Sequence, residues 1–215
     1  MKEYKLFLFD FDYTLIDSSK GIASCINYGF EKMNYPLKSP QEISCTIGQS
    51  LQGAFFSLSG DNNLNNYEKF KQLFMEQSKR VMAEYSVIYE GTIEALKFLK
   101  ENDKKVGIVS AKDHATIKKI AERFNFLQYV DLIVGEDDVV NQKPDPEALN
   151  KAINDTCSTA NQTIYVGDSV FDAEMATNAK IDFLPILGGV STRIDFERFE
   201  KIKVLSVISE IKEFV

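Results

Sequence analysis

Short apolar runs recur along this 215-residue chain and are separated by stretches of helical periodicity. The runs cover residues 6–9, 106–109, 132–134, 164–166 and 183–187. Runs of this length are typical of central strands of a parallel sheet, which are buried on both faces. Between them, apolar residues at helical spacing, such as Ile117, Ile120 and Phe124, indicate amphipathic helices. The alternation predicts an α/β fold with a doubly wound parallel sheet.

The segment from residue 16 to residue 89 breaks this alternation, because it carries helical patterns and little sign of a strand. Apolar stripes run from Ile22 to Met33 and from Phe70 to Met82, and they indicate the core of a small helical bundle. The motif Ser39-Pro40-Gln41-Glu42 is typical of a capped helix start. We therefore expect residues 16–89 to form an all-helical cap domain, inserted into a core made of residues 1–15 and 90–215.

Two aspartates, Asp10 and Asp12, stand one residue apart at the end of the first apolar run. Alternation along a strand turns both side chains to the same side. Like charges that lie so close repel each other unless a cation or a shared proton stabilises them. The pair therefore points to a metal site and to proton-transfer chemistry.

Other polar residues follow the ends of later predicted strands. Ser110 follows the run 106–109, and Asp168 follows the run 164–166, with Asp172 four residues further on. Lys143 lies in a loop before another predicted helix. Ligands of doubly wound sheets bind beyond the carboxyl ends of the strands, so we expect these side chains to meet at one edge.

Each of these residues alone also has a purely structural explanation. Asp12 could make a hydrogen bond within a turn, Asp168 could cap the following helix, and a lone lysine such as Lys143 is usually solvated. Their joint placement at the predicted strand ends favours a common site.

Together these residues suit phosphate chemistry. A tight carboxylate cluster favours Mg²⁺, which prefers oxygen ligands, and Asp10 and Asp168 are the natural ligands. Lys143 and Ser110 can bind phosphoryl oxygens. Phosphoryl transfer depends mainly on positioning and charge neutralisation, and a carboxylate can itself be the nucleophile.

The order of these motifs resembles the haloacid dehalogenase superfamily, on its phosphatase side. That family carries an Asp-x-Asp-x-Thr strand end, a Ser or Thr strand end, a Lys, and a Gly-Asp-x-x-x-Asp. Here the four motifs match residues 10–14, Ser110, Lys143 and residues 167–172. The helical insert resembles the family's small cap domain, so the resemblance covers essentially the whole chain.

The resemblance implies a role for each matching residue. Asp10 would be the nucleophile and a Mg²⁺ ligand, and Asp12 would be the general acid and then the general base. Asp12 would also bind the metal through its backbone carbonyl. The remaining roles are metal binding by Asp168, support of the metal shell by Asp172, and phosphate binding by Thr14, Ser110 and Lys143, with Thr14 orienting that site.

Tyr13 departs from the family pattern, which usually has Gly at this position. Glycine there eases the turn after the strand. We expect Tyr13 to point toward the cap and to narrow the pocket, which bears on substrate preference more than on chemistry.

The resemblance also ranks the possible reactions. Asp12 argues against a dehalogenase, and the cap loop 46–51 has no lysine, which disfavours phosphonate cleavage. That loop, with Gly48, resembles phosphoglycolate phosphatases and related pyrophosphatases. We therefore expect a Mg²⁺-dependent phosphatase acting on a small phosphate monoester, phosphoglycolate being one candidate, through an aspartyl-phosphate.

Three alternatives remain open at this stage. One is an inorganic pyrophosphatase, and another is a phosphosugar mutase of the β-phosphoglucomutase type. Such mutases typically have a His in the cap, whereas the single histidine here, His114, follows the second motif and is expected on a helix surface. A non-catalytic binding protein is disfavoured because all four motifs are intact.

Bulk properties limit the partners. The net charge of −7 argues against non-specific nucleic-acid binding, and no apolar run approaches a membrane span. Three scattered cysteines, Cys25, Cys45 and Cys157, fit buried reduced thiols in a cytoplasmic protein. The expected partner is a small phosphorylated metabolite, and the oligomeric state is not predictable.

Overall fold

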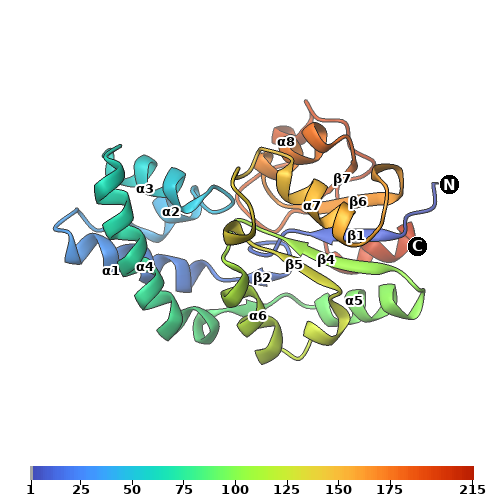
Figure 1. The fold of residues 1–215 in the computed structure, drawn as a ribbon, viewed down its shortest axis with the longest axis horizontal. Coiled ribbons are helices and arrows are strands. Elements are labelled where there is room, and N and C mark those ends of the chain that lie inside the picture. The colour runs from blue at the N-terminus through green and yellow to red at the C-terminus, as the bar shows by residue number, and fades with distance from the viewer. Residues whose placement is uncertain (1) are drawn as a thin grey trace.

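The computed structural model describes residues 2–215 and has two parts, a core built on a sheet and a helical cap beside it (Figure 1). The core sheet has five parallel strands in the order β5-β4-β1-β6-β7. The strands are β1 (Leu6–Phe9), β4 (Lys105–Val109), β5 (Leu132–Val134), β6 (Thr163–Gly167) and β7 (Asp182–Pro185). Each predicted apolar run forms one of these strands, so the predicted parallel sheet is confirmed.

Helices cover both faces of this sheet. On one face lie α5 (Thr92–Glu101), α6 (His114–Arg123) and the 3₁₀ helix η5 (Ile208–Phe214). On the other lie α7 (Glu147–Asp155) and α8 (Val170–Ala179). Four shorter 3₁₀ helices are η1 (Leu127–Tyr129), η2 (Glu136–Asp138), η3 (Ala160–Gln162) and η4 (Ile194–Phe196).

The central strand β1 shows why the chain folds this way. Phe7 and Phe9 belong to the hydrophobic cluster beneath α5 and α6, whereas Leu6 and Leu8 belong to the cluster beneath α7 and α8. All four side chains are completely buried. Because neighbouring side chains on a strand face opposite ways, an unbroken apolar run fills both clusters and places β1 at the centre.

The cap contains the helices α1 (Ser19–Lys32), α2 (Pro40–Ser44), α3 (Leu51–Ser59) and α4 (Leu64–Tyr85). Its core is aromatic: Phe55 stacks on Phe70 with ring centroids 4.9 Å apart, and Phe30 meets Phe70 edge-on at 5.6 Å. The Ser39 hydroxyl and the Glu42 carboxylate form a reciprocal capping box at the start of α2, as predicted. The two predicted apolar stripes therefore pack against each other as a bundle core.

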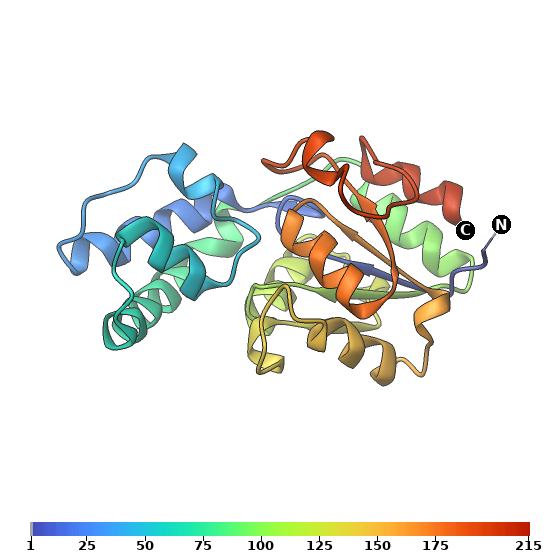
Figure 2. The same cartoon turned by 90° about the horizontal axis from the view of Figure 1, so that it is seen from above.

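Two short crossings join the cap to the core (Figure 2). They contain β2 (Ile16–Asp17) and β3 (Val87–Ile88), which pair antiparallel. The sequence gives little sign of these strands because two residues are too few to set up an alternation. The segment 16–89, expected to be all-helical, therefore begins with the short strand β2 and ends just after the short strand β3.

Two of the cysteine expectations are wrong. Cys25 is buried and Cys45 and Cys157 are exposed, although all three are free thiols. Cys45 ends the short helix α2 and Cys157 follows the end of α7, so neither lies on the inward face of a long element. Within residues 2–215, no helix is both long and apolar enough to cross a membrane.

Candidate active site

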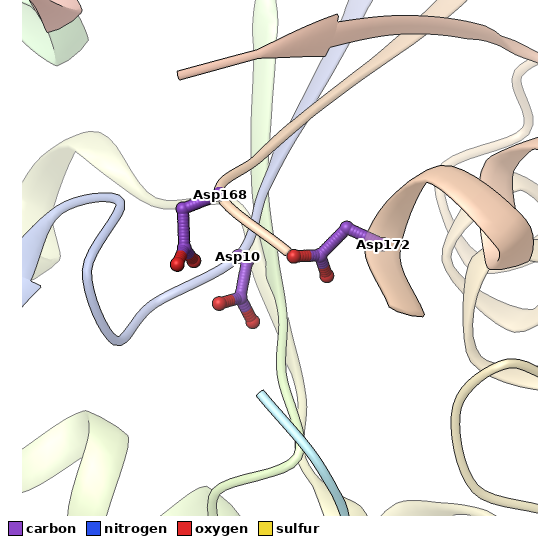
Figure 3. Close-up of side chains that lie close together, drawn as sticks. All are labelled: Asp10, Asp168 and Asp172. Atoms are coloured by element: carbon purple, nitrogen blue, oxygen red, sulfur yellow. The ribbon is translucent and has the colours of Figure 1, made fainter. Parts of the chain in front are cut away.

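The carboxyl ends of three neighbouring strands bring the predicted residues to one edge of the sheet. Asp10 follows β1, Ser110 follows β4, and Asp168 follows β6. Asp172 lies in the first turn of α8, directly after the loop that carries Asp168. Figure 3 shows the carboxylates of Asp10, Asp168 and Asp172 side by side, with Asp10 between the other two.

Lys143 reaches this cluster from the loop before α7. Its ammonium lies 2.6 Å from an oxygen of Asp10 and 2.6 Å from an oxygen of Asp172. The lysine side chain is only 3% exposed, which rules out the solvated alternative. Burial disfavours the ammonium ion, but the attraction of Asp10 and Asp172 outweighs it and raises the pKa of Lys143 above its ordinary value.

Asp172 has all of its acceptor positions engaged by protein donors. One oxygen accepts from Lys143 and from the Tyr165 hydroxyl at 2.9 Å. The other accepts from the backbone N–H and the hydroxyl of Ser169, at 3.0 and 2.6 Å. A carboxylate satisfied in this way is suited to hold its neighbours in place rather than to bind a further ligand.

The three acids form the kind of cluster that binds a hard cation. One oxygen from each of Asp10, Asp168 and Asp172 lies within 4.8 Å of the others, and all three residues are buried. Burial raises the pKa of Asp10 to about 7, and burial together with Asp172 and Asp10 raises the pKa of Asp168 well above its ordinary value. One lysine therefore does not balance the cluster, and a cation such as Mg²⁺ fits its charge and its oxygen donors.

Asp10 and Asp168 are the acids with room for such an ion. Among the hydrogen bonds of residues 2–215, Asp10 accepts only from Lys143, and Asp168 only from the Thr14 hydroxyl at 3.4 Å. Thr14 is completely buried, so its side chain contacts Asp168 and offers no surface to a substrate. This geometry suits Thr14 to orienting Asp168.

Asp12 is held by two residues that the sequence analysis missed. One of its oxygens lies 2.9 Å from the ammonium of Lys112, and the other accepts from the hydroxyl of Ser18. The side chains of Lys112 and Asp12 are 7% and 12% exposed. The sequence carries no local signal for Lys112, because β4 ends at Val109 and strand alternation does not extend to the bend at residues 111–112.

Ser110 completes the predicted set. The residue is 7% exposed and lines a cavity of about 70 Å³ together with Asp10 and Asp12. Its hydroxyl accepts from the backbone N–H of Lys112 at 3.4 Å, which leaves its own proton free to donate to a bound anion.

Tyr13 and Gly48 are among the residues through which the cap and this edge of the core meet. Tyr13 has a left-handed backbone, with φ of 60°, and its hydroxyl lies 3.1 Å from that of Ser44 at the end of α2. The expectation that Tyr13 points toward the cap is confirmed. Gly48, with φ of 96°, approaches Ser169 so closely that an added Cβ would lie 3.0 Å from the serine Cβ.

Two further residues lie near the site, His114 and Gly189, and only the first was predicted from the sequence. His114 begins α6, and its ring lies 2.8 Å from Asp138 with the side chain 40% exposed, so the predicted surface position is confirmed. Gly189, after β7, was missed: a Cβ there would lie 1.9 Å from an oxygen of Asp168. Nothing in the local sequence marks a glycine that another strand's aspartate requires.

Comparison with known proteins agrees with this architecture. Residues 7–186 match the family model for haloacid dehalogenase-like hydrolases. The crystal structure of a haloacid dehalogenase-like hydrolase from Bacteroides fragilis superposes with a TM-score of 0.94 at 31% identity, covering 97% of this chain and 100% of that one.

Two curated relatives carry more specific names. Pyrophosphatase PpaX from Halalkalibacterium halodurans is 34% identical over 184 residues, which is 83% of this chain and 81% of the relative. Phosphoglycolate phosphatase from Nitrosococcus oceani is 21% identical over 220 residues, covering 100% of this chain and 98% of the relative. The two names differ in substrate, and both describe the release of phosphate.

Proposed function

The chain belongs to the haloacid dehalogenase-like hydrolases and is a phosphatase of that family, and we propose that it hydrolyses a small phosphate monoester with Mg²⁺ as cofactor. The observation that carries the proposal is the contact of Lys143 with Asp10 and Asp172, beside Asp168, at the carboxyl edge of the sheet. A dianionic phosphate is repelled by a carboxylate unless positive charge lies beside both. The Lys143 ammonium and a metal held by the acids would supply that positive charge.

Asp10 is the nucleophile in this proposal. Its carboxylate attacks phosphorus, the bond from phosphorus to the ester oxygen breaks, and an aspartyl-phosphate forms. Lys143 and Ser110 bind the phosphoryl oxygens, and Lys143 also holds the Asp10 carboxylate at 2.6 Å. Asp10, Asp168 and the backbone carbonyl of Asp12 would hold Mg²⁺, which would supply positive charge against the phosphoryl group.

Asp12 acts as general acid in the first step and as general base in the second. In the first step it gives a proton to the departing ester oxygen, and an alcohol is released. In the second step it takes a proton from water, whose oxygen bonds to phosphorus, so that phosphate leaves and Asp10 is restored. Lys112 and Ser18 each bind one oxygen of Asp12, which fixes the direction in which that carboxyl faces the cavity.

Thr14 and Asp172 position the other groups. The Thr14 hydroxyl donates a hydrogen bond to Asp168. Asp172 accepts a hydrogen bond from Lys143, and Ser169 and Tyr165 donate hydrogen bonds to Asp172 in turn. These contacts support roles in which neither residue touches the substrate. The substrate in this proposal is a small phosphorylated metabolite of the cytoplasm, and neither a nucleic acid nor a membrane takes part.

Phosphate release from a panel of monoesters and from pyrophosphate tests the proposal. The assay compares the wild type with Asp10→Asn, in each case with Mg²⁺ and after treatment with EDTA. We expect release that needs Mg²⁺, stops with EDTA, returns when Mg²⁺ is added back, and is lost in Asp10→Asn.

The same panel separates the alternatives. Preference for pyrophosphate over every monoester would support a pyrophosphatase. Absence of release together with isomerisation of a phosphosugar would support a mutase. Absence of both activities, in a protein that binds Mg²⁺, would contradict the enzymatic proposal.

A further inference from the structure

A cavity of about 70 Å³ extends from the proposed nucleophile into the cap. Its floor includes Asp10, Asp12 and Ser110 from the core. A single buried water needs about 10–15 Å³ on this measure, so the cavity has room for about five water-sized groups. A substrate whose phosphoryl group sits on the floor therefore finds room for a compact leaving group in the remaining space.

The walls that the cap contributes are mainly apolar. They include the side chains Ile22, Ile26, Leu51, Phe74, Met75 and Met82. Apolar walls favour an apolar surface on the leaving group, because that surface then leaves water without stranding polar atoms.

The charges around the cavity are unfavourable to a second anionic group. Lys112 is the sole basic residue among the lining residues, and its ammonium is already 2.9 Å from the Asp12 carboxylate. Glu136 and Asp113 add two more acids. The Glu136 side chain is 11% exposed, with the ammonium of Lys71 at 3.8 Å, and Asp113 caps α6.

A carboxylate or a second phosphate in this space would meet Glu136 and Asp113, whereas the one basic residue of the lining, Lys112, is held beside Asp12 at the phosphoryl end. Lys143 does not relieve this shortage, because it is committed to Asp10 and Asp172 at the phosphoryl end. Burying an anion without a partner is strongly unfavourable, so the cavity selects against charged leaving groups.

One polar atom in the walls has no partner. Ser78, on α4, lines the cavity and is 3% exposed, and its hydroxyl makes no hydrogen bond to any atom of residues 2–215. Buried hydroxyl groups are nearly always hydrogen-bonded, so an unpartnered one beside a ligand cavity points to a hydrogen bond with the ligand.

We infer that the cap cavity takes a compact, uncharged and mainly apolar leaving group that offers one hydrogen-bonding atom to Ser78. The inference rests on the proposed phosphatase function and narrows its substrate to phosphate monoesters of small neutral alcohols. In the reaction the bond from phosphorus to the ester oxygen breaks, Asp12 protonates that oxygen, and water supplies the oxygen that leaves as phosphate.

Two isosteric substrates isolate the effect of charge. The glycolyl group of 2-phosphoglycolate and its amide have the same number of heavy atoms and differ by one negative charge. We expect kcat/KM for the amide to exceed that for 2-phosphoglycolate by at least about tenfold, as loss of about 1.4 kcal/mol of binding would give. Equal rates, or a preference for 2-phosphoglycolate or pyrophosphate, would overturn the inference.

Two variants locate the effect in the cavity. Ser78→Ala removes the hydroxyl, and we expect it to lower kcat/KM for the amide about three- to tenfold more than it lowers kcat/KM for isobutyl phosphate, which offers no hydrogen-bonding atom there. Gln49→Lys adds a cation at a residue that lines the cavity, and we expect it to raise the relative rate on 2-phosphoglycolate. A uniform change on all substrates in both variants would contradict the assigned roles.

4-Nitrophenyl phosphate distinguishes failure of this inference from failure of the proposed function. Its leaving group is activated, so hydrolysis reports the phosphoryl chemistry even where the cavity is a poor fit. Release from this ester together with a preference for charged leaving groups overturns the inference alone. Absence of release from every ester overturns the proposed function and, with it, the inference.

Discussion

The ammonium of Lys143 lies 2.6 Å from the carboxylate of Asp10, although 133 positions separate the two residues in the chain. The contact joins the loop before α7 to the end of β1, across the edge where the parallel strands end. It also places the Lys143 ammonium against two of the three buried acids of the cluster, Asp10 and Asp172. Both the stability of this edge and its chemistry therefore depend on one side chain.

Lys143→Met keeps most of the length of the side chain and removes its charge. We expect the variant to lose about 3–5 kcal/mol of unfolding free energy at neutral pH without Mg²⁺, because it leaves buried acids without their partner. Mg²⁺ is expected to restore part of the stability, since the proposed metal site is made of the same acids, but not the phosphate release. Urea unfolding with and without Mg²⁺ measures the first effect and the phosphate assay the second.

Asp172→Asn serves as the matched control for this variant, because it removes one acid from the same contact. We expect the double variant Lys143→Met with Asp172→Asn to be more stable than Lys143→Met alone. If the losses of unfolding free energy in the two single variants simply added up in the double variant, the ion pair would not couple Lys143 to Asp172.

The bond between Tyr13 and Ser44 links the core to the cap. Tyr13→Phe removes the hydroxyl and keeps the ring, and Ser44→Ala removes the other partner. We expect either change to cost about 0.5–1.5 kcal/mol of cap closure and to raise amide hydrogen exchange in residues 40–50, with little effect on the core strands. We expect hydrogen exchange in the double variant to be almost the same as in either single variant, because both changes remove the same bond. Mass spectrometry measures this exchange. Additive effects of the two changes would contradict the link.

The sheet and the main residues of the site could be predicted from the sequence because both follow from local patterns. The run Leu6–Phe9 is completely buried, so its lack of polar alternation reports a central strand directly. The rule that ligands bind beyond strand ends then brings Asp10, Ser110 and Asp168 together without knowledge of any contact.

The missed features depend on how distant segments meet. The contacts of Asp12 with Lys112 and Ser18 involve the end of β4 and the start of α1, and no spacing in the sequence reports that they converge. Gly189 is required by the carboxylate of Asp168 on the neighbouring strand, not by its own turn. The exposure of Cys45 depends on how the short helix α2 sits on the cap, which its five residues do not encode.

Glu136 makes the stability of the protein depend on pH. Burial raises the pKa of its carboxyl above the usual range, and the attraction of Lys71 only partly opposes this. The folded state therefore holds this proton more tightly than the unfolded state does. The resulting stabilisation is complete below the unfolded pKa and is lost as the pH rises through the folded pKa.

Glu136→Gln removes this titration. We expect the variant to gain stability relative to the wild type as the pH rises from about 4 to about 7. Urea unfolding of both proteins without Mg²⁺ measures the difference in unfolding free energy between them. The contributions of the other acids are the same in both proteins and cancel in this difference. A difference that does not change with pH, or that favours the wild type more at neutral pH, would be inconsistent with the buried carboxyl described above.

Gly189 lies close enough to Asp168 that its missing side chain bears on metal binding. A Cβ at this position would lie 1.9 Å from an oxygen of Asp168, far inside van der Waals contact, whereas a Cβ at Gly188 would instead meet the backbone oxygen of Tyr13. The backbone of Gly189 is not in the left-handed region, so alanine is disfavoured there by this contact alone.

Gly189→Ala is therefore expected to turn the Asp168 carboxylate away from Asp10 and to weaken Mg²⁺ binding about ten- to a hundredfold, the range found when a ligand loses its supporting contact. The readout is the Mg²⁺ concentration that half-restores phosphate release, together with the rise in melting temperature that Mg²⁺ produces. Asp168→Asn gives the scale for loss of the ligand itself. If Gly189→Ala responds to Mg²⁺ like the wild type, then either Asp168 does not bind the ion or the loop after β7 shifts without moving the Asp168 carboxylate. A normal Mg²⁺ response in Asp168→Asn as well would show that Asp168 does not bind the ion.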